Sequence, residues 1–135
     1  MNLVVDVGNT LIKIAVFDQN RLVYKQVSIK SDVHKHLELI LEDYPKIENA
    51  ILSLVGSFSD KNISKLEKLF KLHILTPASK IPFVNDYTTP QTMEVNRIAL
   101  VSDPTKQYSG KNVLVIDMWN IITYNQSLIH TYHFL

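Results

Sequence analysis

Apolar and polar positions alternate along the first part of the chain in three short runs separated by turn formers. The apolar runs are Leu3–Val5, Leu11–Phe17 and Leu22–Val27. Gly8-Asn9 and Gln19-Asn20 lie between the runs, and such pairs are typical of tight hairpin turns. The pattern therefore predicts a three-stranded antiparallel meander over residues 2 to 28.

From residue 32 onward, helical spacing alternates with short apolar runs. Apolar residues follow three- and four-residue spacing from Asp32 to Tyr44, and Pro45 ends that pattern. The mainly apolar run from Ala50 to Val55 is typical of a strand buried on both faces, and we expect it to join the meander's sheet. Ser59 is a suitable cap for a second helix. The expected inner face of that helix is Ile63, Leu66, Leu69 and Phe70.

The last part of the chain begins with a predicted strand at His73–Leu75 and a long loop that contains three prolines, from Thr76 to Pro90. A helix is then predicted over Thr92–Val101, followed by a strand over Asn112–Met118 that pairs with Ile121–Tyr124 as a hairpin. The alternation of strands and helices indicates an α/β fold.

Composition indicates a soluble globular protein and excludes several classes of function. Of the 135 residues 46% are hydrophobic, and 14 Lys+Arg stand against 13 Asp+Glu. Proteins that coat nucleic acid or an anionic membrane need a larger basic surplus. The chain has no cysteine, which excludes disulfides, thiolate zinc sites and cysteine nucleophiles. The first residues, Met1 to Ile14, carry Asp6 and no basic leader, so we expect neither a signal peptide nor an anchor, and a cytoplasmic location.

The segment from Asp6 to Thr10, followed by Lys13, combines the groups that a phosphate site needs. An aspartate at a strand end can hold a metal-bound water, a glycine lets backbone amides approach an anion, and the polar side chains offer donors to phosphate oxygens. The same segment also suits an ordinary hairpin turn, in which Gly8 and Asn9 supply positive φ and the aspartate a local hydrogen bond. The residues alone leave both interpretations open.

Two further candidate groups lie later in the chain. Arg97 could clamp a carboxylate and Tyr87 could donate a hydrogen bond to it, although a solvated helix start explains the same residues. Asp117 ends a predicted buried strand. A carboxylate there must be satisfied by a cation, by a hydrogen-bond donor or by the amides of a turn. Turn capping and cation binding are therefore both open. The five histidines show no ligand pattern for a metal and are expected at the surface.

These clusters, in this order and spacing, resemble motifs of the type III pantothenate kinases, members of the actin, sugar kinase and Hsp70-like ATPase superfamily. Residues 6 to 13 are similar to the family's first phosphate motif. Residues 87 to 97, Tyr-Thr-Thr-Pro-Gln-Thr-Met-Glu-Val-Asn-Arg, resemble its Tyr-x-x-Pro-x-Thr-Leu-Gly-x-Asp-Arg segment. Residues 115 to 124 match the frame of its Ile-Asp-Ala-Gly-Thr segment. Taken together, the three motifs are specific for this family.

The resemblance implies an actin-like (ribonuclease H-like) α/β fold with a mixed sheet led by the antiparallel meander. Residues 1–110 would form the first domain, and residues 111–135 the incomplete start of a second related domain, because Asp117 ends an aliphatic run as Asp6 does. Family members are longer, so we expect most of the second domain to be missing.

The resemblance also implies ligands and roles. ATP phosphates with Mg²⁺ would bind at Asp6, Val7, Gly8, Asn9, Thr10, Leu11, Ile12, Lys13 and Asn120, with Asp6 holding the magnesium through water. Pantothenate would lie against Tyr87, Glu94, Val95, Asn96 and Arg97. Asp117 would bind an activating monovalent cation, K⁺ or NH₄⁺. The implied partners are the small-molecule substrate and a second copy in a family-type homodimer, with no nucleic acid and no membrane.

Four departures from the family motifs bear on activity. Asn96 stands where the family has its catalytic base aspartate, and an amide does not accept the substrate's hydroxyl proton. Glu94 replaces a glycine beside the anionic substrate, and Trp119-Asn120 replaces the Gly-Thr of the second phosphate loop. Two functions therefore compete: ATP-dependent phosphorylation of pantothenate, the first step of coenzyme A biosynthesis, and a non-catalytic remnant that binds nucleotide. The departures predict little or no kinase activity.

We hypothesise that a local frameshift in the gene explains the departure at Trp119. Removal of one T from the Trp codon would let the following bases read Gly-Thr, as the family loop requires. A nearby compensating deletion would restore the frame by Ile122, and the tail from Gln126 to Leu135 would be a second out-of-frame stretch.

Overall fold

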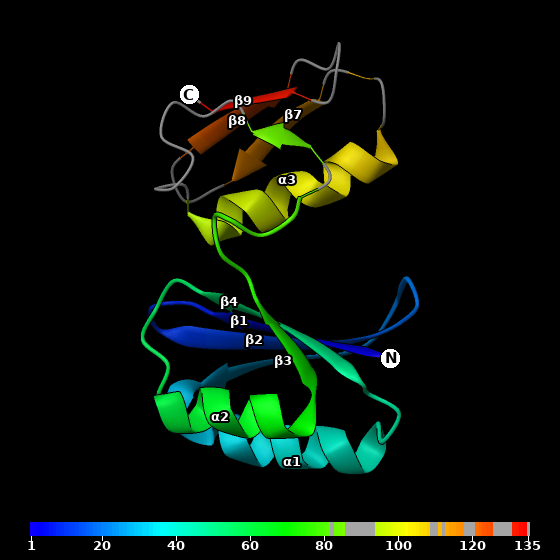
Figure 1. Cartoon of the computed structure of the whole chain (residues 1–135), viewed down its shortest axis with the longest axis vertical. Coiled ribbons are helices and arrows are strands. Elements are labelled where there is room, and N and C mark those ends of the chain that lie inside the picture. The colour runs from blue at the N-terminus through cyan, green and yellow to red at the C-terminus, as the bar shows by residue number, and fades with distance from the viewer. Residues whose placement is uncertain are drawn as a thin grey trace. The chain divides into compact units, whose positions relative to one another are not determined.

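The computed structural model describes residues 1–81, 83–85, 94–108, 111, 113–117, 121–125 and 131–134. Contacts divide the chain into two compact units, Met1–Leu75 and Thr76–Leu135. Each unit has its own sheet, and Figure 1 labels most of the helices and strands.

The first unit is built on a mixed five-stranded sheet. Its strands are β1 (Asn2–Val7), β2 (Leu11–Asp18), β3 (Arg21–Ile29), β4 (Asn49–Leu54) and β5 (Lys71–Ile74), in the order β3-β2-β1-β4-β5. β1, β2 and β3 pair antiparallel, whereas β4 pairs parallel to β1 and β5 parallel to β4. This is the actin-like arrangement that the resemblance implies. The predicted meander, and the fourth strand in the same sheet, are confirmed.

Strand alternation gives the central strands of this sheet one buried face. Leu3, Val5 and Val7 of β1 are completely buried, and Ile12 and Ile14 of β2 are their neighbours. Helices α1 (Val33–Asp43) and α2 (Asp60–Leu69) both lie on one face of the sheet, as Figure 1 shows. The short helix η1 (Lys30–Asp32) leads into α1.

Both predicted helices of this unit are present. Val33, Leu37 and Ile40 are the buried residues of α1, which ends one residue before Tyr44, and they follow the expected spacing. In α2 one position of the expected inner face is wrong: Leu69 is 41% exposed, while Phe70, just beyond the last helical residue, is buried. The helix ends there, so Phe70 leaves helical geometry and reaches the core from an extended backbone.

The second unit contains a four-stranded sheet and one helix. Its elements are β6 (Val84–Asn85), α3 (Val95–Gln107), β7 (Val113–Asp117), β8 (Ile121–Asn125) and β9 (Thr131–Phe134), with strand order β6-β9-β8-β7. The predicted β7–β8 hairpin is confirmed. Two features differ from the sequence expectation: α3 continues past Val101 through Pro104, and β9 adds a strand in the tail.

The division between the units does not coincide with the expected boundary after residue 110. The structure groups Thr76 onward with the second sheet, because α3 contacts β7 and β6 pairs with β9. The assignment of residues 1–110 and 111–135 to two family domains stays a prediction. Within the described part of the chain, no helix has the length and apolar character needed to cross a membrane.

Candidate functional site

The first phosphate-site candidate lies where β1 and β2 meet. Asp6 is the second-last residue of β1, and the antiparallel register places Lys13 of β2 directly beside it. Lys13 Nζ lies 3.5 Å from Asp6 Oδ2, and the two side chains are 64% and 35% exposed. An ion pair this exposed stabilises the fold by only about 0 to 1 kcal/mol. Both charged groups are therefore accessible to a ligand.

The turn between these strands is held by the backbone of its neighbours. The Gly8 amide donates to the Leu11 carbonyl at 3.0 Å, and the amides of Val55 and Gly56 both donate to the Val7 carbonyl at 3.0 Å. These bonds join the β1–β2 turn to the loop after β4. Because the Gly8 amide is used inside the turn, phosphate donors at this site are expected from the exposed Asn9 and Thr10 and from Lys13.

The glycines act through size rather than through positive φ. Neither Gly8 nor Gly56 has a φ in the left-handed region, and among the described non-glycine residues only Gln19 has a positive φ, at 53°. The hairpin interpretation that assigned positive φ to Gly8 and Asn9 is therefore wrong in that detail. A Cβ on Gly56 would lie 2.2 Å from the Gly8 carbonyl oxygen, so this close approach of two loops excludes a side chain.

The parallel pairing of β1 with β4 brings a further residue to the site. Ser53 of β4 is in register with Asp6, so the two side chains share one face of the sheet. Within the described residues, Ser53 Oγ and Asn62 Oδ1 are the buried side-chain polar atoms without a hydrogen-bond partner. Asp6 thus lies between Lys13 on one strand and Ser53 on the other. In open α/β sheets, ligands bind at the carboxyl ends of parallel strands, where this trio lies.

The loop after β4 contacts Lys30 of η1 and ends at the start of a helix. Lys30 Nζ lies 3.4 Å from the hydroxyl oxygen of Ser57. Two residues later Ser59 caps α2, its Oγ accepting a hydrogen bond from the Asn62 amide at 3.4 Å, as predicted. Sequence reasoning missed Ser53, Gly56 and Lys30. Gly56, directly after the predicted buried strand, was the signal that could have directed attention to this loop.

The second candidate cluster lies at the start of α3, in the second unit. Arg97 Nε lies 4.0 Å from Glu94 Oε2, and Asn96 Oδ1 accepts a hydrogen bond from the Arg97 amide at 2.9 Å. Val95 is buried beside Ile98 on the inner side of the helix. The structure brings Glu94, Asn96 and Arg97 together, while Tyr87 lies outside the described residues.

The third candidate, Asp117, is the last residue of β7 and pairs with Ile121 of β8. Trp119 and Asn120 lie outside the described residues. In the part of the chain that the structure describes, no group of three or more His, Cys, Asp or Glu side chains could hold a metal ion.

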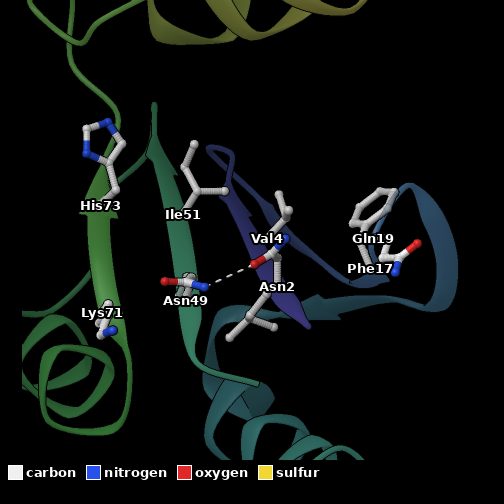
Figure 2. Close-up of a pocket in the computed structure, with 10 residues that line it drawn as sticks. Asn2, Val4, Phe17, Gln19, Asn49, Ile51, Lys71 and His73 are labelled. Carbon is white, nitrogen blue, oxygen red and sulfur yellow. Dashed lines mark hydrogen bonds between the residues drawn. The ribbon is translucent and has the colours of Figure 1, made fainter. Parts of the chain in front are cut away.

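A groove of about 450 Å³ lies on the first unit's sheet, and its lining residues Val4 and Ile51 precede Asp6 and Ser53 by two residues on the same face. Figure 2 shows Val4 and Ile51 on neighbouring strands, with Lys71 of β5 at one side. Asn49 Nδ2 donates to Asn2 Oδ1 at 3.3 Å across the groove floor. Asn2, Asn49 and Lys71 are the first residues of their strands, so the groove lies toward the amino ends, opposite to the Asp6 site.

Comparison with known proteins identifies the family. The family model for type III pantothenate kinase matches residues 2–125. The chain belongs to this family. Relatives named type III pantothenate kinase occur in Christiangramia forsetii, 45% identical over 93% of this chain, and in Flavobacterium johnsoniae, 37% identical over 93%. A third, in Bacteroides fragilis, is 34% identical over 92%. The family resemblance seen in the motifs is confirmed.

The pantothenate kinase relatives are longer than this chain. The chain spans 51% of the length of each of these three proteins. A solved structure from Bacteroides thetaiotaomicron, described as a protein with an actin-like ATPase fold and unknown function, is similar with a TM-score of 0.44 and 22% identity. That similarity covers 58% of this chain and 34% of the other.

Proposed function

We propose that the first unit binds the phosphates of ATP together with Mg²⁺ at the carboxyl ends of β1 and β4. The observation that supports this most is the position of Asp6 between Lys13 and Ser53 on three adjacent strands. Magnesium prefers oxygen ligands, keeps several waters and binds through one or two carboxylates plus phosphate oxygens, so a site with one carboxylate and a neighbouring hydroxyl fits it. When bound, Mg²⁺ neutralises charge on the phosphates.

In this proposal, Asp6 holds the magnesium through water, and Lys13 balances phosphate charge. Asn9 and Thr10 are exposed in the turn and donate to phosphate oxygens. Val7, Gly8, Leu11 and Ile12 shape the turn through their backbone. Asn120 is proposed as a further ATP ligand from its family motif alone.

The remaining ligands are proposed from the family motifs. Pantothenate would lie against Tyr87, Glu94, Val95, Asn96 and Arg97, and Asp117 would bind K⁺ or NH₄⁺. The Arg97 guanidinium suits a carboxylate because it offers several donors in a fixed plane. A cytoplasmic location and a family-type homodimer belong to the same proposal.

We further propose that this chain transfers little or no phosphate to pantothenate and acts as a nucleotide-binding member of the kinase family. Asn96 is the observation that favours this alternative. Its Oδ1 accepts a hydrogen bond from the Arg97 amide, and a carboxamide does not take up the substrate proton.

Calorimetric titration of the whole chain with ATP tests the nucleotide site. We expect binding in the presence of Mg²⁺ that weakens when EDTA removes the metal. Asp6→Asn should weaken magnesium-dependent binding, whereas Asp18→Asn, an exposed aspartate at the other end of β2, should leave it unchanged. Equal affinity of Asp6→Asn and wild type would contradict the proposed site.

A further inference from the structure

We propose that the Ser53 hydroxyl is a ligand-binding group of the magnesium–ATP site, accepting a hydrogen bond from the water shell of the ion that Asp6 holds. This inference rests on the proposed function. It adds a residue from β4, far from the phosphate motif in the sequence, to the β1–β2 turn.

The first ground is the state of the hydroxyl in the protein alone. Ser53 is 8% exposed, and its Oγ has no hydrogen-bond partner within the described part of the chain. A buried polar atom left without a partner costs about 1 to 3 kcal/mol. Such an atom is usually explained by strain, by a functional role or by a bound water or ion.

The second ground is where the hydroxyl lies. Register pairs Ser53 with Asp6 across two parallel strands, so both side chains project from the same face at the carboxyl end of the sheet. Lys13 occupies the corresponding place on the other neighbour of β1. The same face therefore offers a cation, a carboxylate and a hydroxyl on three adjacent strands.

The third ground is the rigidity of the backbone around Ser53. The amides of Val55 and Gly56, two and three residues further along, both donate to the Val7 carbonyl, next to Asp6. The Leu75 amide donates to the Leu52 carbonyl at 2.8 Å on the other side. Ser53 is thereby fixed relative to Asp6, which suits a group that positions a ligand.

A bound Mg²⁺ retains several water molecules, and these waters donate strong hydrogen bonds. Asp6 has two carboxylate oxygens to accept them, and the Ser53 hydroxyl adds another acceptor that is already desolvated. A water of the bound metal would thus supply the partner that the hydroxyl lacks among the described residues. Its contribution should accordingly depend on magnesium.

The test compares the whole chain with three variants, using ATP titration with Mg²⁺, ATP titration in EDTA, and thermal unfolding without ligand. Ser53→Ala should weaken magnesium-dependent ATP binding by about tenfold, the loss of one charge-assisted hydrogen bond. It should leave binding in EDTA unchanged and leave the unfolding midpoint equal or higher, because the hydroxyl makes no bond in the protein alone. Ser53→Thr retains the hydroxyl and should restore most of the affinity.

Ser28→Ala is the matched control. Ser28 is a buried serine of the same sheet, in register with Ile12 on the helix-covered face, and its Oγ donates to the Ile29 carbonyl at 3.0 Å. Loss of this hydrogen bond should lower the unfolding midpoint and leave ATP affinity unchanged. Ser53→Ala should instead weaken ATP binding without lowering the midpoint. Direct binding of Mn²⁺ by electron paramagnetic resonance gives a second readout, and Ser53→Ala should weaken it in the presence of ATP.

The outcomes separate the two proposals. If wild type binds magnesium–ATP and Asp6→Asn weakens it, but Ser53→Ala binds like wild type, the Ser53 proposal alone is overturned. Equal weakening by Ser53→Ala with and without magnesium would overturn it too, because the hydroxyl would then contact phosphate directly. If wild type binds no ATP, both proposals fail.

Discussion

Of the two described glycines, Gly56 leaves less room for a side chain. A Cβ there would lie 2.2 Å from the Gly8 carbonyl oxygen and 2.7 Å from its carbonyl carbon, and both atoms belong to the backbone. Side-chain rotation cannot relieve such a contact, so the two loops would have to separate. The same loops hold the backbone beside Asp6, which links the size of this residue to the geometry of the site.

We therefore expect Gly56→Ala to lower the free energy of unfolding by about 1 to 3 kcal/mol, the usual cost of overpacking. Urea unfolding, monitored by circular dichroism, measures this free energy. Ser57→Ala is the control, because Ser57 is the exposed next residue and should change stability by less than about 0.5 kcal/mol. Equal stability of Gly56→Ala and wild type would show that the loops do not approach as described.

Asn96 stands where the family motif has its base aspartate, and this difference bears on activity. A positioned carboxylate base contributes about a hundred- to ten-thousand-fold to the rate of proton transfer. Asn96→Asp restores that group, but Glu94 and Trp119 still replace the small residues of the family's substrate and phosphate motifs. We expect no detectable pantothenate phosphorylation by wild type or by Asn96→Asp in a radiolabelled phosphate-transfer assay with ATP, Mg²⁺ and K⁺. Turnover above background in wild type would mean that the substituted residues are tolerated.

Among the elements, α2 depends on its cap. Ser59 precedes the helix in extended conformation, and its Oγ accepts from the Asn62 amide. Ser59→Ala should lower the free energy of unfolding by about 1 kcal/mol, as loss of an N-cap does. Ser64→Ala, at an exposed position within the same helix, should cause no loss because alanine favours helix. Chemical denaturation of both variants measures the two changes in the free energy of unfolding. A larger loss for Ser64→Ala than for Ser59→Ala would contradict the role of Ser59 as the cap.

Elements with local signals were predictable from the sequence. The meander follows from alternation and turn residues, and α1 follows from helical spacing ended by Pro45. The end of α3 was not predictable, because Pro104 reads as a stop signal and the helix nevertheless continues to Gln107. The local sequence signal therefore does not mark the end of this helix.

The candidate site shows the same contrast. The pairing of Asp6 with Lys13 follows from one hairpin and could be inferred from the sequence. The pairing of Asp6 with Ser53 depends on a parallel contact between distant segments, which no local pattern reveals. Nor did the sequence show that Asn96 Oδ1 bonds to the next amide, because that depends on the helix start.

For the whole molecule, the two units have separate cores. The first core includes Leu3, Ile14, Leu37 and Leu52, and the second includes Phe83, Ile98 and Val101. Within the first unit, β1, β2 and β4 each pair on both sides, while β3 and β5 lie at the edges of the sheet. Hydrogen exchange on the whole chain should therefore find the slowest amides in β1, β2 and β4 and faster ones in β3 and β5. Slower exchange in β5 than in β1 would contradict the strand order.

The claim on which this account depends is that the β1–β2 turn and the end of β4 form one magnesium–ATP site. Nuclear magnetic resonance of the ¹⁵N-labelled whole chain, titrated with ATP and Mg²⁺, tests it most directly. We predict shifts of the amides of residues 6 to 13 and 53 to 57, and broadening of the same signals when Mn²⁺ replaces Mg²⁺. The contradicting result is the absence of shifts in these segments, or shifts centred instead on Asn2, Asn49 and Lys71 around the groove.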